Sequence, residues 1–425
     1  MSTRGFTAIA FPMLSCWLAG CQPMLHLTST PPVLQNSKSD ESPAAASGSS
    51  DRMTLLYATT REPRGEEDAR SYDGTLGDGL RLGVATLHVD EESGKARVRE
   101  LQTLPLLTGS WDRPTAHLQS LSEKAVFRSG ADLDVLSHDT ERFFADIDHA
   151  LSAGHDKDVF IYVHGGMNGV DRTAAQAAQY CELTERDSVV VAFVWPTTDY
   201  FPNYRDDVSN ARQSVPAFSR FIELLARHTH AQHINILAHS AGARIVSSAL
   251  ASLGEAAKGA AREGLRDQLR LGEVYYAAAD IEIKEFVRQL KHYADLPLRV
   301  TLQANRDDHI LALLGMLPSG SRAGRLNLDE LNTPELESLK HWANGSRLDI
   351  VDVTSERGGN LTARGHAFWY QRRWVSSDLL LEFMYHVPPE MRGLEPSDSD
   401  GLRRWVFPSD YEKRVAAALQ RLSRL

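Results

Sequence analysis

The sequence predicts an α/β fold, with a mostly parallel central sheet and helices on both of its faces. From about residue 138 onward, continuous apolar runs alternate with amphipathic helical stripes. The apolar runs lack an exposed polar side, which indicates parallel strands covered by helices on both faces. The expected strands are 159–163, 188–195, 274–279, 298–303 and 348–353, together with the run that begins at Ile234.

Helical stripes separate these strands in the chain. The first is made by Phe143, Phe144, Ile147 and Leu151, and others are expected around 173–182, at 206–228 and after Ser240. Earlier in the chain, the sequence predicts a strand at 53–60, a Gly- and charge-rich loop to Gly83, and a strand pair at 82–89 and 95–104. In a three-layer sheet of this kind, the active site is expected at the carboxyl ends of the strands.

Composition excludes several classes of protein. The chain has 425 residues, of which 42% are hydrophobic and 24% charged, so a large core is expected rather than disorder. A net charge of -10 gives no basic surface for nucleic acid. The sequence has no H-E-x-x-H, no paired cysteines and no glycine-rich nucleotide loop, and His164 alone cannot form a metal site. We therefore expect no metal, cofactor or nucleic-acid partner.

The N-terminal segment, residues 1–21, is typical of an export signal. Arg4 provides a positive charge before an apolar run too short for a stable membrane span. The following Leu-Ala-Gly-Cys resembles a bacterial lipobox, which implies lipidation of Cys21 and a membrane anchor; the alternative is a buried apolar element. Gln22 resembles the residue found after the cysteine in lipoproteins sorted to the outer membrane. The expected location is the cell envelope, at the outer membrane facing the periplasm.

After the signal, a Ser-, Pro- and Ala-rich stretch without apolar periodicity predicts a disordered tether at 22–50. One α/β domain is expected over 51–425, divided into a strand-rich segment at 51–137, a core at 138–385 and a C-terminal helical extension at 386–425. Only Cys181 remains in the mature chain, so no intrachain disulfide is expected, and we place this cysteine in a buried helix.

A polar insertion is expected at 318–345, before the last predicted strand. Its segment 327–342 is compatible with a helical lid or with surface decoration, and the sequence favours neither. The segment 411–425 is amphipathic and is expected to form a helix that packs against the domain.

The run Ile-Asn-Ile-Leu-Ala-His-Ser-Ala-Gly at 234–242 has the outline of a nucleophile elbow, a sharp strand-to-helix turn with a serine at its tip. Ser240 is therefore the candidate nucleophile. Ala238 replaces the first glycine of G-x-S-x-G, although its side chain is still small. The alternative is a serine that caps a helix after a core strand.

A serine nucleophile needs a base and an acid that orients it. His366 is the expected base, because it follows a glycine in a loop after the last strand. Its neighbour at the elbow, His239, is expected to point away from the serine, and none of His292, His309 and His341 combines both features of His366. The expected acid is Asp308, after the strand 298–303. The alternatives are Asp307 and Asp280, of which the second could instead cap a helix.

Two backbone amides are the candidate oxyanion donors. The run Val-His-Gly-Gly-Met-Asn-Gly at 163–169 ends a buried strand with glycines, which let backbone N–H groups approach a substrate oxygen. We expect the donors to be the amides of Gly166 and Ala241. Trp195, which precedes a proline at the end of a strand, is expected in the core, with a substrate contact as the alternative.

Several motifs together resemble a bacterial family of α/β hydrolases of unknown function with esterase- and lipase-like members. The matching residues are Leu56 to Arg61, Val163 to Gly166, Val194 to Pro196, Tyr204, Asp206, Ser214, Ile234 to Gly242, Asn305 to Leu311, and Gly365 with His366. The resemblance implies an α/β-hydrolase fold and a triad of Ser240, Asp308 and His366. Ala241 and Gly166 replace a methionine and a bulky residue common in the family, which implies a more open pocket floor.

These observations lead to a functional hypothesis, an esterase- or lipase-like serine hydrolase that cleaves a small-molecule or lipid carboxylic ester through an acyl-enzyme. One alternative is a catalytically silent domain that serves as an envelope binding lipoprotein. Another is an acyltransferase that uses the same three residues, since fold and triad do not specify the acyl acceptor.

Overall fold

The computed structural model describes residues 52–65, 71–89, 96–103, 136–184, 187–198, 203–257, 259–317, 320–354, 366 and 368–422. The expected signal, the tether and Cys21 lie outside these residues. Among the described helices, none is both long and apolar enough to cross a bilayer.

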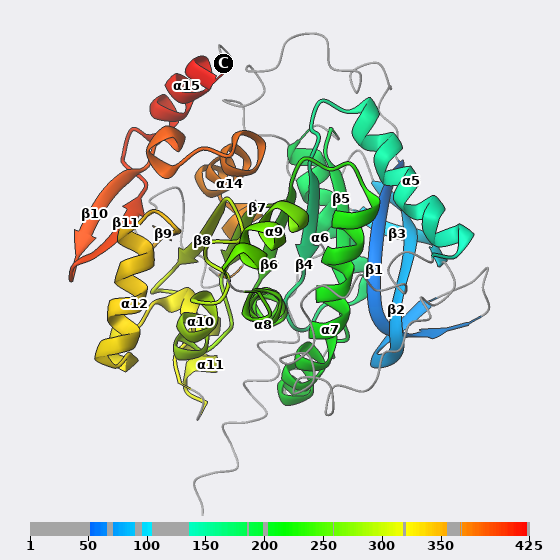
Figure 1. The fold of residues 1–425 in the computed structure, drawn as a ribbon, viewed down its shortest axis with the longest axis horizontal. Helices are drawn as coiled ribbons and strands as arrows, with labels where there is room; N and C mark the ends of the chain where they lie inside the picture. The colour runs from blue at the N-terminus through cyan, green and yellow to red at the C-terminus, as the bar shows by residue number, and fades with distance from the viewer. Residues whose placement is uncertain are drawn as a thin grey trace, which may run out of the picture.

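The strands form one sheet in the order β10-β11-β9-β8-β7-β6-β4-β5-β1-β2-β3 (Figure 1). From β1 across to β11 the neighbours are parallel, whereas β2, β3 and β10 are antiparallel to theirs. The strands are β1 (Arg52–Arg64), β2 (Ser71–Val89), β3 (Ala96–Thr103), β4 (Val159–Val163), β5 (Val189–Val194), β6 (Ile234–His239), β7 (Leu271–Ala277), β8 (Arg299–Ala304), β9 (Leu348–Asp352), β10 (Glu395–Ser399) and β11 (Leu402–Val406).

Helices cover both faces of this sheet. The α-helices are α5 (His138–Ala153), α6 (Val170–Leu183), α7 (Tyr204–His228), α8 (Gly242–Glu255), α9 (Ala260–Leu269), α10 (Ile283–Leu290), α11 (His309–Gly315), α12 (Thr333–Asn344), α13 (Phe368–Gln371), α14 (Arg373–Tyr385) and α15 (Tyr411–Leu422). Short 3₁₀ turns are η4 (Ala323–Arg325), η5 (Leu328–Glu330) and η6 (Pro389–Arg392).

The two faces of each central strand belong to different cores. In β4, Val159, Ile161 and Val163 pack with α5, α7, α8, α9, α10 and α12. Phe160 and Tyr162 point to the other side and pack with α6, α11, α14 and α15. Because alternate side chains of a strand point to opposite faces, an all-apolar strand must be covered by helices on both faces of the sheet. The predicted three-layer α/β fold is confirmed.

The predicted central elements are found close to their expected positions. The strand at 159–163 has those bounds, and the helix expected at 206–228 begins at Tyr204. One strand differs more: β7 begins at Leu271 and ends at Ala277, and Ala278 turns the chain with a φ of 50°. Cys181 is buried in α6, as expected.

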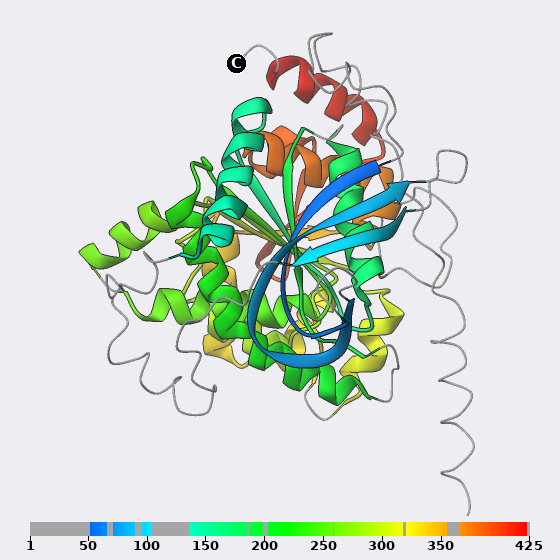
Figure 2. The ribbon, with the colours of Figure 1, turned by 90° about the vertical axis from the view of Figure 1, so that its right-hand side faces the viewer.

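The expected loop before Gly83 is wrong in part, because β2 already begins at Ser71. Its first half pairs with the end of β1, where Arg61 lies opposite Leu76 and Pro63 opposite Tyr72. Figure 2 shows these two strands as a long curved ribbon. Pairing with a neighbouring strand therefore imposes an extended conformation on a segment whose composition favours a loop.

The helical extension expected at 386–425 is helical only in part: the helix expected at 411–425 is found as α15, packed through Val415 and Leu419. Two strands, β10 and β11, precede α15 and extend the sheet beyond β9. The hairpin between them turns at Asp400 and Gly401, with φ values of 59° and 69°. Positive φ at both central residues is the geometry that favours Asp-Gly in two-residue hairpins.

The expected insertion before β9 contains α12, which begins with a capping box at Asn332 and Glu335. This helix contacts α10, β9 and β11 and contributes Leu339 and Ala343 to the core. It is therefore part of one helical layer of the domain.

Candidate active site

Ser240 lies at the sharp turn between β6 and α8, with a φ of 51°. This left-handed conformation costs a residue with a Cβ on the order of 1 kcal/mol or more, so neighbouring groups must hold it. The Ser240 N–H donates to the carbonyl of Ala277 at 2.9 Å. The Ser240 carbonyl accepts from Asp280 N–H at 2.9 Å and Ala243 N–H at 3.1 Å. The turn is thus fixed by its own helix and by the segment after β7.

Close backbone approaches explain the small residues around the turn. A Cβ at Gly242 would lie 2.5 Å from the carbonyl oxygen of Val163 and 2.7 Å from that of His164. A Cβ at Gly165 would lie 2.8 Å from the Cβ of Ser240. The first position of the motif tolerates Ala238, which is fully buried in β6.

Three predicted side chains form one hydrogen-bonded series. The His366 Nε2 lies 2.8 Å from Ser240 Oγ, and its Nδ1 lies 2.8 Å from Asp308 Oδ2. Asp308 is fully buried at the N-cap of α11, where its Oδ1 accepts from Leu311 N–H at 2.9 Å. The two carboxylate oxygens therefore have separate partners, one in the helix and one in the imidazole, and the helix fixes the orientation of the carboxylate.

The ionisation of His366 follows from its surroundings. Burial by itself lowers the pKa of His366, but attraction to Asp308 and their hydrogen bond outweigh burial and raise the pKa above its usual value. In the neutral imidazole, Nδ1–H donates to Asp308, so Nε2 is available to accept the proton of Ser240. This arrangement can remove a proton from the hydroxyl.

The competing acids and histidines have other partners or are exposed. Asp307 and His309 are exposed on either side of Asp308. Asp280 is buried, and its carboxylate accepts from Tyr204 Oη at 2.6 Å and pairs with Arg322 Nε at 2.9 Å. The carbonyl of His292 accepts from Arg262 Nη2 at 2.6 Å, and His341 is exposed with its ring edge-on to Trp342.

The loop after β4 presents the first expected oxyanion amide. The Gly165 carbonyl is held by the Nδ1 of His164 at 2.7 Å and accepts from Asn168 Nδ2 at 3.1 Å. Because the peptide between Gly165 and Gly166 is planar and trans, fixing this carbonyl also fixes the Gly166 N–H in the opposite direction. Among the described residues, neither this N–H nor that of Ala241 has a hydrogen-bond acceptor.

His164 is itself fixed by Trp195, the residue directly after β5. Its Nε2 accepts from Trp195 N–H at 3.0 Å, and the Trp195 indole N–H donates to the His164 carbonyl at 2.7 Å. Burial lowers the pKa of His164 well below its usual value, so the ring is neutral. Trp195 is fully buried and stacks on this ring, in agreement with the core position expected for it.

Sequence reasoning missed the role of His239. The ring of this residue lies beside that of His366, with centroids 5.4 Å apart, and its Nε2 lies 3.0 Å from the backbone carbonyl of His366. Burial, with the nearby His366, lowers the pKa of His239 to about 3, so the neutral ring donates Nε2–H to that carbonyl. His239 thereby positions the backbone of His366, and its place directly before the elbow was the available signal.

Asp207 was also missed. It is fully buried, whereas Asp206, which carried the family resemblance, is exposed. Asp207 accepts from Thr198 N–H at 2.7 Å and from Met167 N–H at 3.3 Å, and a Cβ at Gly166 would lie 3.2 Å from its Oδ2. Burial raises the pKa of Asp207 to about 6. The carboxyl therefore fixes the outer side of the loop after β4.

No curated protein matches the chain. A family model described as an alpha/beta hydrolase of unknown function (DUF900) matches residues 140–377, more than half of the 425 residues. The matched region begins in α5 and ends in α14, and it contains β4 to β9, the turn at Ser240 and the loop after β4. The chain therefore belongs to this family of α/β hydrolases.

Proposed function

We propose that this protein is a serine hydrolase that cleaves carboxylic esters through an acyl-enzyme. The hydrogen-bonded series from Ser240 through His366 to Asp308 carries the proposal, because a serine hydroxyl is a poor nucleophile without an oriented base. Ser240, His366 and Asp308 are then the nucleophile, the base and the orienting acid. Family membership supports hydrolysis in general.

In the proposed reaction, Ser240 Oγ forms a bond to the ester carbonyl carbon while its proton moves to His366 Nε2. The carbonyl oxygen becomes an anion that accepts from the N–H groups of Gly166 and Ala241, and each such donor is typically worth ~10²–10³ in rate. As the bond to the alcohol breaks, His366 returns the proton to the leaving oxygen. Water then attacks the carbonyl carbon of the acyl-enzyme while His366 accepts its proton. The bond to Ser240 Oγ breaks, His366 returns the proton to Oγ, and the acid is released.

The assignment is tested with short- and long-chain p-nitrophenyl esters and with S240A. We expect the substitution to lower kcat/KM by at least roughly 10⁴-fold, because it removes the nucleophile. Circular dichroism of the variant checks that the fold is retained. Hydrolysis by S240A at the rate of the unchanged protein would end the assignment.

A fluorophosphonate probe separates a hydrolase from a silent binding domain, since only an activated serine reacts rapidly with it. We expect one label per chain on Ser240 and none on S240A.

An acyltransferase is distinguished by adding alcohols or amines during turnover. If the acyl group is transferred to the added alcohol or amine faster than the free acid is released, water is not the preferred acyl acceptor, and the protein is an acyltransferase and not a hydrolase.

The proposal places this activity at a membrane, through acyl chains on Cys21. Mass spectrometry of the N-terminal peptide from cells tests the modification. We expect a lipidated Cys21 peptide and release of the C21A variant into the soluble fraction. An unmodified N-terminus that still fractionates with membranes would contradict the anchor.

A further inference from the structure

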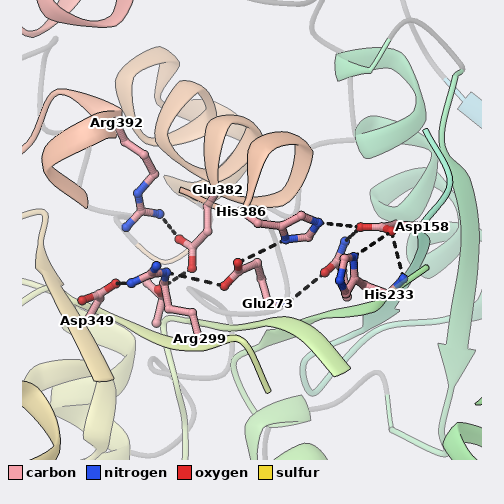
Figure 3. A network of polar contacts seen from close by, with 10 residues as sticks. Asp158, His233, Glu273, Arg299, Asp349, Glu382, His386 and Arg392 are labelled. Carbon is pink, nitrogen blue, oxygen red and sulfur yellow. Dashed lines mark hydrogen bonds and ion pairs between the residues drawn. The ribbon is translucent and has the colours of Figure 1, made fainter. Parts of the chain in front are cut away.

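A second group of polar residues lies at the other end of the sheet from Ser240. Asp158 directly precedes β4 and His233 directly precedes β6, and these strands are parallel neighbours. His386 is the C-cap of α14 and reaches the same place. Figure 3 shows the three side chains turned toward one another, with Glu273 of β7 beside them.

The ligand atoms of these three residues converge. One from each residue lies within 4.8 Å of the other two. Asp158 Oδ1 is 3.2 Å from His233 Nδ1, and Asp158 Oδ2 is 2.8 Å from His386 Nε2. Ligand atoms on a tetrahedral ion, with bonds of ~2.0–2.1 Å, stand about 3.3 Å apart. Small side-chain rotations therefore suffice to place all three around one ion.

Surrounding groups orient these ligands as they do in metal proteins. The His386 Nδ1 lies 3.2 Å from Glu273 Oε1, which leaves Nε2 directed at Asp158. A carboxylate behind a ligating imidazole fixes its tautomer and raises its basicity. Asp158 also accepts from His233 N–H at 2.9 Å and from Asn235 Nδ2 at 3.0 Å.

One buried carboxylate oxygen of the site lacks a hydrogen-bond donor within the described part of the chain. Glu273 is fully buried, and its Oε2 has no hydrogen-bond partner among the described residues. The Nε of Arg299 lies 3.8 Å from that oxygen, and the Nη1 of Arg299 also binds Asp349. The side chains of His233 and His386 are 31% and 21% exposed, so an ion can enter from solvent.

We propose that Asp158, His233 and His386 bind a zinc-type divalent transition-metal ion. Two imidazole nitrogens and a carboxylate oxygen are ligands that suit Zn²⁺, and water completes the fourth position. The ion cross-links the entries to β4 and β6 with the end of α14, away from the proposed reaction. The proposal does not depend on the proposed esterase activity.

A proton competes with the metal ion for the imidazole of His386. Burial lowers the pKa of His386, but its hydrogen bonds to Asp158 and Glu273 outweigh burial and raise the pKa to about 9. The imidazole therefore holds a proton when no metal is bound, and metal binding must release it. Binding is best measured in mildly alkaline buffer for this reason.

The test is calorimetric titration of the full chain with ZnCl₂ after removal of metals by EDTA. We expect uptake of one equivalent, a visible absorption band typical of four-coordinate Co²⁺ when cobalt replaces zinc, and a higher Tm with metal. H386N and H233Q should each weaken binding at least ~10-fold. Asn is a suitable replacement at position 386, because the His386 φ is 50° and Asn tolerates positive φ.

His230 provides the matched control. It lies three residues before His233, is 93% exposed, and pairs with Asp148 at 2.6 Å without a second histidine. H230Q should therefore bind zinc like the unchanged protein. Circular dichroism and unfolding in EDTA check that each variant is folded. If H386N fails to fold, the zinc affinity of H233Q, whose histidine is more exposed, decides the test.

Three outcomes would overturn the proposal: no stoichiometric uptake, the same affinity in H233Q as in the unchanged chain, or an equal loss in H230Q. The active site also contains a histidine and an aspartate. Binding that is lost in H366N but kept in H233Q would place the ion there and would likewise contradict this site.

Discussion

At the scale of single residues, the candidate site combines a strained serine with buried groups whose ionisation is set by their neighbours. Ser240 is held by hydrogen bonds from both sides, and His366 is held at its ring by Asp308 and at its carbonyl by His239. Positions fixed before substrate arrives reduce the reorganisation needed in the transition state. The ionisation of His366 is the property that a pH profile measures.

We expect kcat/KM for an ester to fall as the pH drops through a value above 6.5. Only neutral His366 accepts the proton of Ser240, and Asp308 raises the pKa of His366, so the imidazole is protonated and inactive below that value. In D308N this attraction is lost. The acid limb of the profile should then move to lower pH, while the rate falls by roughly 10³- to 10⁴-fold.

An acid limb at the same pH in both proteins would mean that another group controls the rate. H309Q is the matched control, because His309 is the exposed neighbour of Asp308. Its profile should follow that of the unchanged protein.

At the scale of elements, the elbow depends on how closely α8 approaches the end of β4. Gly242 begins this helix, and the Val163 and His164 carbonyls lie where a side chain would start. The turn therefore requires glycine for space, although the backbone of Gly242 is helical and would accept any residue.

G242A should inactivate the protein and destabilise it by several kcal/mol, on the order of the larger overpacking effects. Its added methyl group would lie 2.5 Å from a backbone oxygen, so the helix and strand must separate. G264A is the control, since a Cβ there meets nothing within 4 Å in α9. Alanine in an exposed helix stabilises by about 0.5–1 kcal/mol over glycine. Equal urea midpoints for the two variants would contradict the close approach.

The central strands were predictable because they are apolar on both faces. Position after such strands pointed to Asp308 and His366 but left Asp307 and Asp280 open as alternatives to Asp308. The strand β10, Glu-Pro-Ser-Asp-Ser, has no apolar period, and it forms because β11 pairs with it. The Asp-Gly pair at its turn was a usable signal.

Other parts of the site could not be predicted from local pattern. Asp206 and Asp207 are both acidic residues in the first turn of α7, and only packing shows which one is buried beneath the loop after β4. The contact of His239 with His366 joins residues far apart in the chain. Periodicity gives the face on which a residue lies, but it does not give the partner across a loop.

At the scale of the whole molecule, the sheet joins the family region to flanking segments on both sides. Arg61 of β1 lies outside residues 140–377, yet it is buried beside the loop after β4. Its Nε donates to the Trp195 carbonyl at 3.0 Å, and its Nη2 donates to the carbonyl of Asn168. The first strand therefore supports the loop that carries Gly166.

R61M should lower kcat/KM at least tenfold, because Arg61 links the loop after β4, at Asn168, to the segment after β5, at Trp195 and Thr197. R64M is the control on the same strand, since Arg64 is 68% exposed and pairs only at the surface with Asp73. Both proteins are compared by ester hydrolysis and by circular dichroism. Full activity in R61M would show that the loop keeps its shape without β1.

On the other flank, Arg392 in η6 contacts α14, the helix in which the family region ends. Its fully buried guanidinium pairs with Glu382 and, at 3.3 Å, with Asp378 of α14. R392M leaves two buried carboxylates without a cation and should lower the free energy of unfolding by about 3–5 kcal/mol. R288M breaks an exposed pair with Glu285 and should change it by less than about 1 kcal/mol. Equal free energies of unfolding in urea for the two variants would contradict a stabilising role for the buried group of Arg392, Glu382 and Asp378.

The order of the site residues in the chain has a consequence for biosynthesis. Serine, aspartate and histidine are translated in that order, at positions 240, 308 and 366 of 425. A ribosome that has passed the first two has still made a chain without a base. On the proposed roles, such a nascent polypeptide is chemically inert, and its serine gains reactivity only after His366 has been translated and has folded against it.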